Sequence, residues 1–241
     1  PIIHRGQGCD QRLAYSPCWN IKAWPYACPF QEYNDTWYWE QRSKAHDIVQ
    51  KYISVRPEYW AKVDSVLAKT KTTSSKGNLV LGMHLRGSDK GAKRRQVAPA
   101  EFLPYALAFL AAVPDGAIFV ATDDKNYAEQ VTTKWPANVS AAIVRQADVI
   151  VSSNKSSTFD MHASKRHRIN SEVLVDILAM SRCDALIHSA SAVSESAIYF
   201  NLVLHHTSVN LEYGVNTRKF SPESFKTRLR HLVERTKQVN K

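Results

Sequence analysis

The stretch Leu79–Lys90 constrains the fold more than any other part of this 241-residue chain. It reads Leu-Val-Leu-Gly-Met-His-Leu-Arg-Gly-Ser-Asp-Lys, apolar at first and then rich in ionisable side chains. A short apolar run that ends abruptly in such residues predicts a buried strand whose carboxyl end lies at a site. His84 and Arg86 are two residues apart, so on an extended strand they point to the same face. Gly87 then lets the backbone turn or lets a ligand come close.

Basic side chains follow this strand and favour an anionic ligand. Lys90, Lys93, Arg94 and Arg95 come in quick succession, with Asp89 as the only acid beside them. A guanidinium group offers phosphate a planar fork, and an ammonium group offers it a point charge. The cluster therefore favours a pyrophosphate, and the alternative is a solvated charge run after an ordinary strand.

The composition narrows the class of partner. A net charge of +10 favours anionic partners. We expect no nucleic-acid partner, because the chain has neither zinc-finger spacing nor an aromatic RNA-binding signature. No stretch approaches the roughly 18 apolar residues of a membrane span. The chain begins at Pro1, so the loss of an upstream segment that held a membrane anchor stays open.

Cysteines and sequons favour the secretory pathway, in the Golgi or the endoplasmic reticulum lumen. Three cysteines crowd the first segment and the fourth lies in an apolar, helix-like pattern: Cys9, Cys18, Cys28 and Cys183. Cys18 and Cys28 could form a disulfide, with Cys9 pairing elsewhere, and no pair has zinc-knuckle spacing. Three Asn-x-Ser/Thr sequons, whose pattern also arises often by chance, occur at Asn34, Asn138 and Asn154.

The chain divides into two predicted parts. Residues 1–76 form an aromatic, cysteine-containing segment that fills a core or lines an acceptor site. Residues 77–241 alternate between strands and helices, which predicts an α/β fold with a parallel sheet covered on both faces. We expect strands at 79–85, 117–121, 141–144, 184–188 and 207–211. We expect helices at 40–52, 57–69, 100–113, 126–135, 172–182, 194–201 and 221–237. Asn170 or Ser171 would cap the 172–182 helix after a long loop, and Ser221 would cap the last helix.

In a parallel sheet, three of these strand ends meet at one edge. They would bring together His84, Arg86, Thr122, Asp123, Asp124, His188, Ser189 and Ser191. The turn at Ser189–Ser191 opens a helix whose free N–H groups suit a phosphate, and the alternative is that one serine is simply an N-cap. Asp176 lies in an apolar run and needs a partner, which is either solvent or the paired donors of a guanine base. We expect no metal, because adjacent acids differ from the Asp-x-Asp spacing that holds a nucleotide-bound cation.

These motifs resemble those of the GDP-fucose-dependent fucosyltransferase superfamily, which includes α1,6-, protein O- and bacterial nodulation enzymes. His84–Lys90 looks like the first motif of that superfamily, and Ala121–Asp124 resembles its second. Val175–Ile177 and Ser189–Glu195 resemble its third region. The resemblance covers roughly residues 77 to 211. It implies a GT-B fold of two Rossmann-like domains with the nucleotide in the C-terminal one. It also implies inverting transfer of fucose to a glycan or protein acceptor without metal or other cofactor.

The resemblance also implies residue roles. His84 and Asp176 would contact guanine, Arg86 would bind the β-phosphate and stabilise the leaving GDP, and Asp123 would brace Arg86. Ser191 and neighbouring N–H groups would hold phosphate. The catalytic set is therefore expected to be Arg86, Asp123 and Asp124. The donor-binding set is expected to be His84, Arg86, Ser88, Asp89, Lys90, Asp176, Ser189, Ser191 and Ala192.

One departure leaves the catalytic base open. The α1,6 and related enzymes place a Glu shortly after Asp-Lys, where this chain has Lys93, Arg94 and Arg95. The base is then Asp124, Glu101 or a residue of the first segment, or it is absent. Two alternative functions follow: a transferase that uses another GDP-sugar, and a non-catalytic module that binds nucleotide or glycan.

Overall fold

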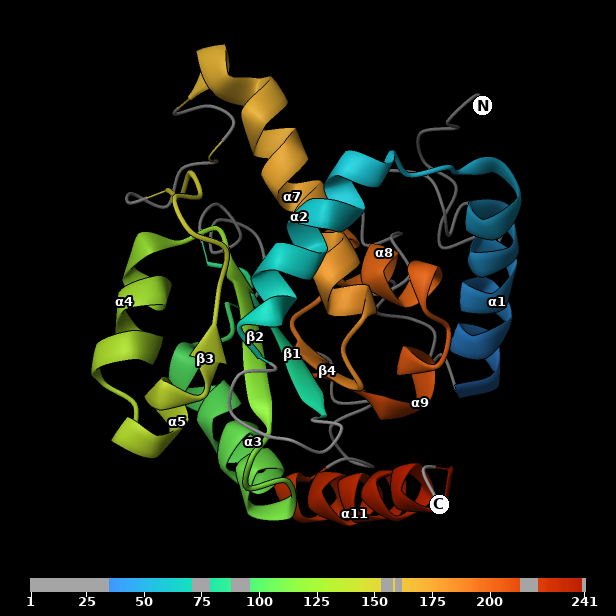
Figure 1. Ribbon diagram of the computed structural model, residues 1–241, viewed down its shortest axis with the longest axis vertical. Coiled ribbons are helices and arrows are strands. Elements are labelled where there is room, and N and C mark those ends of the chain that lie inside the picture. The colour runs from blue at the N-terminus through green and yellow to red at the C-terminus, as the bar shows by residue number, and fades with distance from the viewer. Residues whose placement is uncertain are drawn as a thin grey trace, which may run out of the picture. The chain divides into compact units, whose positions relative to one another are not determined.

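The computed structural model describes residues 35–70, 79–87, 96–152, 158, 162–212 and 221–239, in two compact units, Pro1–Gln41 and Arg42–Lys241. The strands are β1 (Val80–Leu85), β2 (Ala117–Thr122), β3 (Ile143–Val144), β4 (Ala185–His188) and β5 (Ser208–Asn210) (Figure 1). The helices are α1 (Asp35–Tyr52), α2 (Pro57–Ala68), α3 (Pro99–Ala112), α4 (Lys125–Thr133), α5 (Ala137–Ala141), α7 (Arg166–Ser181), α8 (Ala192–Phe200), α9 (Leu204–Thr207) and α11 (Pro222–Val239). A 3₁₀ turn, Ala163–Lys165, leads into α7.

The five strands within the described residues run parallel in one sheet, in the order β3-β2-β1-β4-β5. The chain builds outward from β1 to β3 on one side and then returns to place β4 on the other side of β1. This is the Rossmann order, and the strand order reverses between β1 and β4. The predicted α/β fold with a Rossmann-like parallel sheet is therefore confirmed.

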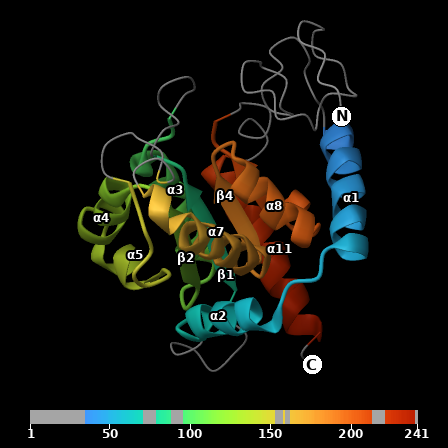
Figure 2. The same cartoon turned by 90° about the horizontal axis from the view of Figure 1, so that it is seen from above.

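Alternating side chains give the sheet two apolar faces. Leu81, Met83 and Leu85 pack with residues of α3, α4, α5 and α11 on one face. Val80 and Leu186 pack with residues of α2, α7 and α8 on the other. Figures 1 and 2 show α7 and α2 crossing the second face, and Phe225 and Leu229 of α11 pack in the cluster with α3 on the first. Both faces are thus covered, as a parallel sheet requires.

The start of α7 corrects the sequence prediction. The helix begins at Arg166, not at Glu172, so neither Asn170 nor Ser171 is its cap. Ser171 lies inside the helix and its Oγ donates to the carbonyl oxygen of His167 at 2.9 Å. The helix starts from the preceding 3₁₀ turn, and its N-cap Lys165 makes no side-chain capping bond. No capping residue therefore marks the true boundary in the sequence.

Cys183 is a second correction, because it lies beyond the end of α7 in the turn before β4. Its thiol is free and buried, and a Cβ added at Gly82 would lie 3.2 Å from its sulfur. Ser221, by contrast, caps α11 as predicted: its Oγ accepts from the N–H of Ser224 at 3.2 Å. The last strand is shorter than expected, since α9 occupies Thr207.

Several expectations fall on residues outside the described ranges. These are Cys9, Cys18, Cys28, Asn34, Asn154, Ser88, Asp89, Lys90, Lys93, Arg94, Arg95 and the linker 71–78. Asn138 is described and lies exposed in α5. The predicted boundary after residue 76 stays a prediction. None of the described helices is long and apolar enough to cross a membrane.

Candidate functional site

The carboxyl ends of β1, β2 and β4 meet at one edge of the sheet, as the sequence predicts. His84 pairs in register with Ala121 of β2 and His188 of β4, and His188 pairs with Asn210 of β5. His84, His188 and Asn210 are 4%, 0% and 1% exposed. The row lies on the sheet face that α7 and α8 cover, because it continues the alternation of Val80 and Gly82 along β1. A buried polar layer therefore underlies the point where the strand order reverses.

The segment after β1 is tied to the segment after β2. Arg86 is the first residue past β1 and is half-buried. The N–H of Gly87 donates to Asp123 Oδ1 at 2.8 Å, and its carbonyl oxygen accepts from Gln96 Nε2. A Cβ added at Gly87 would lie only 2.5 Å from Asp124 Cβ. Glycine here therefore allows the two strand ends to approach each other. The predicted contact of Asp123 with Arg86 stays a prediction.

Two of the acids that the sequence suggests as the catalytic base lie within the described residues. Each of them caps a helix. Asp124 Oδ1 accepts from the N–H groups of Asn126 and Tyr127 at 2.7 and 3.1 Å and so caps α4. Glu101 Oε1 accepts from the N–H of Ala98 at 3.0 Å at the start of α3. Burial, with the charges of Asp124, Asp123 and Glu101 adding to it, raises the pKa of Tyr127 to about 12. A catalytic role for Asp124 stays a prediction.

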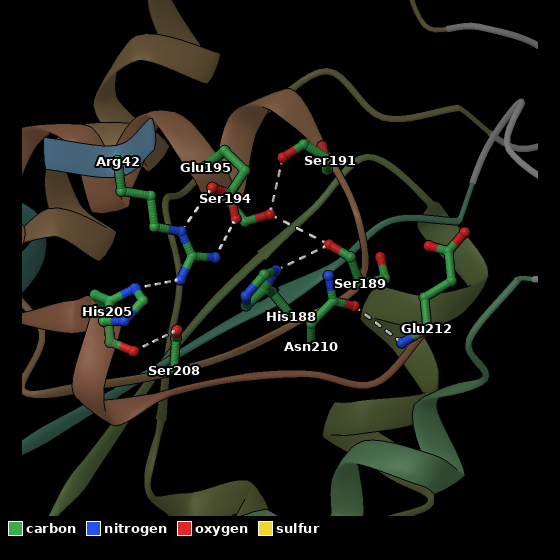
Figure 3. Close-up of polar contacts among 10 residues, drawn as sticks. All are labelled: Arg42, His188, Ser189, Ser191, Ser194, Glu195, His205, Ser208, Asn210 and Glu212. Carbon is green, nitrogen blue, oxygen red and sulfur yellow. Dashed lines mark hydrogen bonds and ion pairs between the residues drawn. The ribbon is translucent and has the colours of Figure 1, made fainter. Parts of the chain in front are cut away.

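In the β4–α8 turn, one serine caps the helix that follows, and its predicted phosphate role stays a prediction. Ser191 is the N-cap of α8, and its Oγ accepts from the N–H of Val193 at 3.3 Å. Ser194 Oγ donates to the carbonyl oxygens of Ser189 and Ser191, at 3.2 and 3.0 Å (Figure 3). Ala192 is the exposed first residue of the helix. The turn therefore presents an ordered helix N-terminus, with its positive dipole end, beside β1.

Glu212 and Asn210 complete this turn, and sequence reasoning did not single them out. Glu212 Oε2 accepts from the N–H of Ala190 at 3.0 Å, and the N–H of Glu212 donates to Asn210 Oδ1 at 3.0 Å. Ser189 Oγ and Asn210 Nδ2 are buried without a hydrogen-bond partner within the described ranges. Asn210 and Glu212 lie at the end of the last predicted strand. The rule that ligands bind beyond the carboxyl ends of parallel strands, which selected Asp123, could therefore have selected them too.

Asp176 has the partner that its apolar surroundings demand. Its Oδ1 accepts from Gln146 Nε2 at 2.5 Å, just after β3. Burial raises the pKa of Asp176 to about 7, although the Gln146 bond and the charge of Arg145 oppose the rise. The nearby charges of Glu172 and Asp123 raise the pKa further. Because Gln146 follows β3, its bond places the carboxyl of Asp176 at the carboxyl edge of the parallel sheet.

A buried ion pair beside the turn was also missed. Arg42, in α1, forms two hydrogen bonds to Glu195 in the first turn of α8, and a third to His205 in α9 (Figure 3). Arg42 and Glu195 are 2% and 1% exposed. In the sequence, Arg42 looks like a solvated residue of an amphipathic helix. Its partner Glu195 is 153 positions away, so no local pattern reveals the ion pair.

Within the described part of the chain, no group of His, Cys, Asp and Glu could hold a metal ion.

Comparisons with known proteins give a loose structural match. No family model and no curated protein matches the sequence. Structures of the α-1,6-fucosyltransferase NodZ co-crystallised with GDP and soaked with GDP-fucose match with TM-scores of 0.39 and 0.40 at 14% and 15% identity. They cover 72% and 70% of this chain. NodZ from Bradyrhizobium matches with a TM-score of 0.36 at 14% identity, over 70% of this chain.

The chain spans only about 60% of the length of these solved fucosyltransferases, 60%, 61% and 60% in turn. At TM-scores this low, the likeness supports no conclusion about activity. A functional assignment for this chain must therefore rest on its own residues.

Proposed function

We propose that the chain belongs to an inverting glycosyltransferase that transfers fucose from GDP-fucose to a glycan or protein acceptor. The observation that carries the proposal is the meeting of two elements at the reversal of strand order. The His84-x-Arg86 motif ends β1, and the N-terminus of α8 follows β4, which is the neighbour of β1. Ligands of Rossmann-like sheets bind at this position. The motifs that resemble the fucosyltransferase superfamily thus fall where a nucleotide would bind.

The two ends of the site suit the two ends of GDP. Asp176 would accept from the N1–H and N2–H₂ donors of guanine, and His84 would contact the base beside it. Arg86 and the N–H groups of the β4–α8 turn would bind the diphosphate, since helix N-termini and guanidinium groups both favour anions. The predicted roles of Ser88, Asp89 and Lys90 belong to the same phosphate end.

Arg86 would supply the main catalytic effect. The acceptor hydroxyl oxygen bonds to the anomeric carbon of fucose while the bond from that carbon to the β-phosphate oxygen breaks. The hydroxyl proton passes to a base, and negative charge develops on the departing GDP. A guanidinium group held at the β-phosphate stabilises that charge more in the transition state than in the ground state. The reaction would then need no metal.

A non-catalytic GDP-binding module is the second candidate, and one observation favours it. Asp124 and Glu101 are the two described acids that the sequence suggests as the base. In each of them a carboxylate oxygen accepts a backbone N–H bond at the start of a helix, which leaves that oxygen less available to accept a proton. A transferase with another GDP-sugar remains a variant of the leading proposal, because the motifs specify GDP better than the sugar. Residence in the secretory pathway remains an expectation from the cysteines and sequons.

Ligand binding in EDTA tests the assignment of GDP. We expect GDP to raise the melting temperature of the protein, with or without EDTA, whereas UDP and ADP give much smaller shifts. Release of GDP from GDP-fucose would then separate the transferase from the binding module. Loss of the GDP shift in EDTA would contradict the metal-free site, and equal shifts for all three nucleotides would contradict recognition of guanine.

The role of Asp176 has its own test. Asp176→Asn should weaken GDP binding but leave the binding of inorganic pyrophosphate unchanged, because the carboxylate is assigned to the base. Equal loss of both ligands would reassign Asp176 to a structural role.

A further inference from the structure

We infer that Arg42 is a positioning residue, which keeps the N-terminus of α8 attractive to the donor diphosphate by neutralising Glu195. The inference rests on the proposed function, in which that helix end binds phosphate. It concerns a residue that lies in α1, far from the nucleotide motifs in the sequence. Its basis is the geometry of one buried ion pair.

Arg42 donates a hydrogen bond to each carboxylate oxygen of Glu195. Arg42 Nε lies 3.0 Å from Glu195 Oε2, and Arg42 Nη2 lies 2.7 Å from Glu195 Oε1. The pair is almost wholly buried, and Figure 3 shows the side chain of Arg42 facing that of Glu195 on α8. A bidentate, desolvated pair of this kind fixes both charges in place.

The third arm of Arg42 fixes the orientation of its guanidinium group. Arg42 Nη1 lies 3.0 Å from His205 Nδ1. Arginine can only donate, so this nitrogen of His205 accepts. The bond to His205 therefore fixes the orientation of the guanidinium group toward Glu195. A lysine has a single ammonium group and could not make the same set of bonds.

The position of Glu195 explains why its charge needs a partner. Glu195 lies in the first turn of α8, and its N–H bonds to the carbonyl oxygen of the N-cap residue Ser191 at 3.1 Å. An unneutralised carboxylate there would oppose an anionic ligand at the same helix end, and the repulsion would be strong in a buried setting. A buried ion pair is seldom retained for stability alone, because desolvation offsets most of its attraction. Arg42 instead preserves the positive end of α8 for phosphate.

Four variants separate this role from simple packing. Arg42→Met removes the positive charge and leaves Glu195 alone. Glu195→Gln removes the negative charge. A double variant, Arg42→Met with Glu195→Met, removes both. His46→Phe is the control, because His46 Nδ1 bonds to the carbonyl oxygen of Tyr199 at 2.8 Å, so its loss loosens α1 from α8 without touching the ion pair.

The readout is the ratio of dissociation constants for guanosine and GDP, measured by calorimetry under the same conditions for the parent and every variant. Arg42→Met should lower GDP affinity on the order of tenfold and change guanosine affinity less than about twofold. The double variant should recover the parent ratio. Glu195→Gln should bind GDP at least as tightly as the parent, and His46→Phe should keep the parent ratio.

Three results would overturn the inference. Arg42→Met could lose GDP and guanosine equally, the double variant could bind GDP as poorly as Arg42→Met, or Glu195→Gln could lose GDP affinity. If Arg42→Met does not fold, the Glu195→Gln result alone decides. If the parent protein binds GDP no tighter than guanosine, the proposed phosphate site itself fails, and that outcome is distinct from all three.

Discussion

The N–H of Gly87 donates to Oδ1 of Asp123 across 2.8 Å and so joins the segments that follow two neighbouring strands. This bond fixes the backbone directly after Arg86, the residue on which the proposed chemistry depends. Asp123 thus acts on the site through the backbone of the β1 motif, whatever further contact its carboxylate makes.

Asp123→Ala should lower the free energy of unfolding by about 1–2 kcal/mol, because it leaves the Gly87 N–H without its charged acceptor. Asp123→Asn keeps an acceptor oxygen and should recover most of that loss. Urea denaturation measures both. The control is Asp115→Ala in the exposed turn before β2, which should change stability by less than about 0.5 kcal/mol. Equal stability of the two alanine variants would show that the bond contributes nothing.

Gly87→Ala should destabilise the protein more than Gly82→Ala. A Cβ at Gly87 would lie 2.5 Å from Asp124 Cβ, so two backbone segments would have to separate. At Gly82 the nearest atom, Leu186 Cδ1, would lie 3.1 Å away, and a side chain can yield. Overpacking costs about 1–3 kcal/mol, so we expect Gly87→Ala near the top of that range and Gly82→Ala near the bottom. The reverse order in denaturation midpoints would contradict the close approach.

Asp176 should make stability depend on pH in an identifiable direction. Burial raises its pKa from 3.8 to about 7, so the folded chain holds this proton more tightly than the unfolded chain does. The resulting stabilisation is full below about pH 4 and is lost as the pH rises through about 7. The groups that act on this pKa besides burial are Gln146, Arg145, Glu172 and Asp123, and all four are present in every variant compared.

Asp176→Asn removes this titration and should therefore gain stability relative to the parent as the pH rises. The measurement is the difference in melting temperature between variant and parent at pH 5 and at pH 8. Most of the loss of stabilisation from Asp176 falls between these two pH values. Asp115→Asn, an exposed control, should show no such change. A constant difference for Asp176→Asn would mean that the carboxyl titrates normally.

Phe225→Ala should cost about 3–5 kcal/mol, because Phe225 is 2% exposed and docks α11 on α3. Its ring lies 5.8 Å from that of Tyr105 in an edge-on contact. Leu107→Ala, on the same helix as Tyr105 but 41% exposed, is the control and should cost less than about 1 kcal/mol. Similar denaturation midpoints for the two variants would mean that α11 does not contribute to the core.

The strands and most helices were predictable because their signals are local. The runs Val80–Leu85 and Ala117–Thr122 are mostly apolar and are buried over their whole length, and Ser221 with Pro222 marks the start of α11. From alternation alone, the carboxyl ends were expected at one edge, and the register of His84 with His188 agrees. The start of α7 was missed because it has no such local marker.

Contacts across long sequence separations were not predictable. Arg42 and Glu195 are ordinary surface residue types, and only the folded chain shows that each buries the other. Glu212 reaches the N–H of Ala190 because β5 lies beside β4, and sequence alone does not give that order. Apart from Asp176 in α7, the described candidate residues that the sequence indicated lie at or directly after the ends of strands, whereas the missed ones lie in neighbouring helices or at the last strand.

Release of GDP from GDP-fucose by the Arg86 variants tests the proposed function most directly. Arg86→Lys keeps the charge but loses the bidentate fork, so it should retain measurable GDP affinity while turnover falls on the order of a hundredfold. Arg86→Ala should abolish turnover, with melting temperatures recorded to exclude unfolding as the cause. Turnover by a folded Arg86→Ala protein at the rate of the parent would contradict the assignment of Arg86 to the leaving phosphate, and with it the transferase.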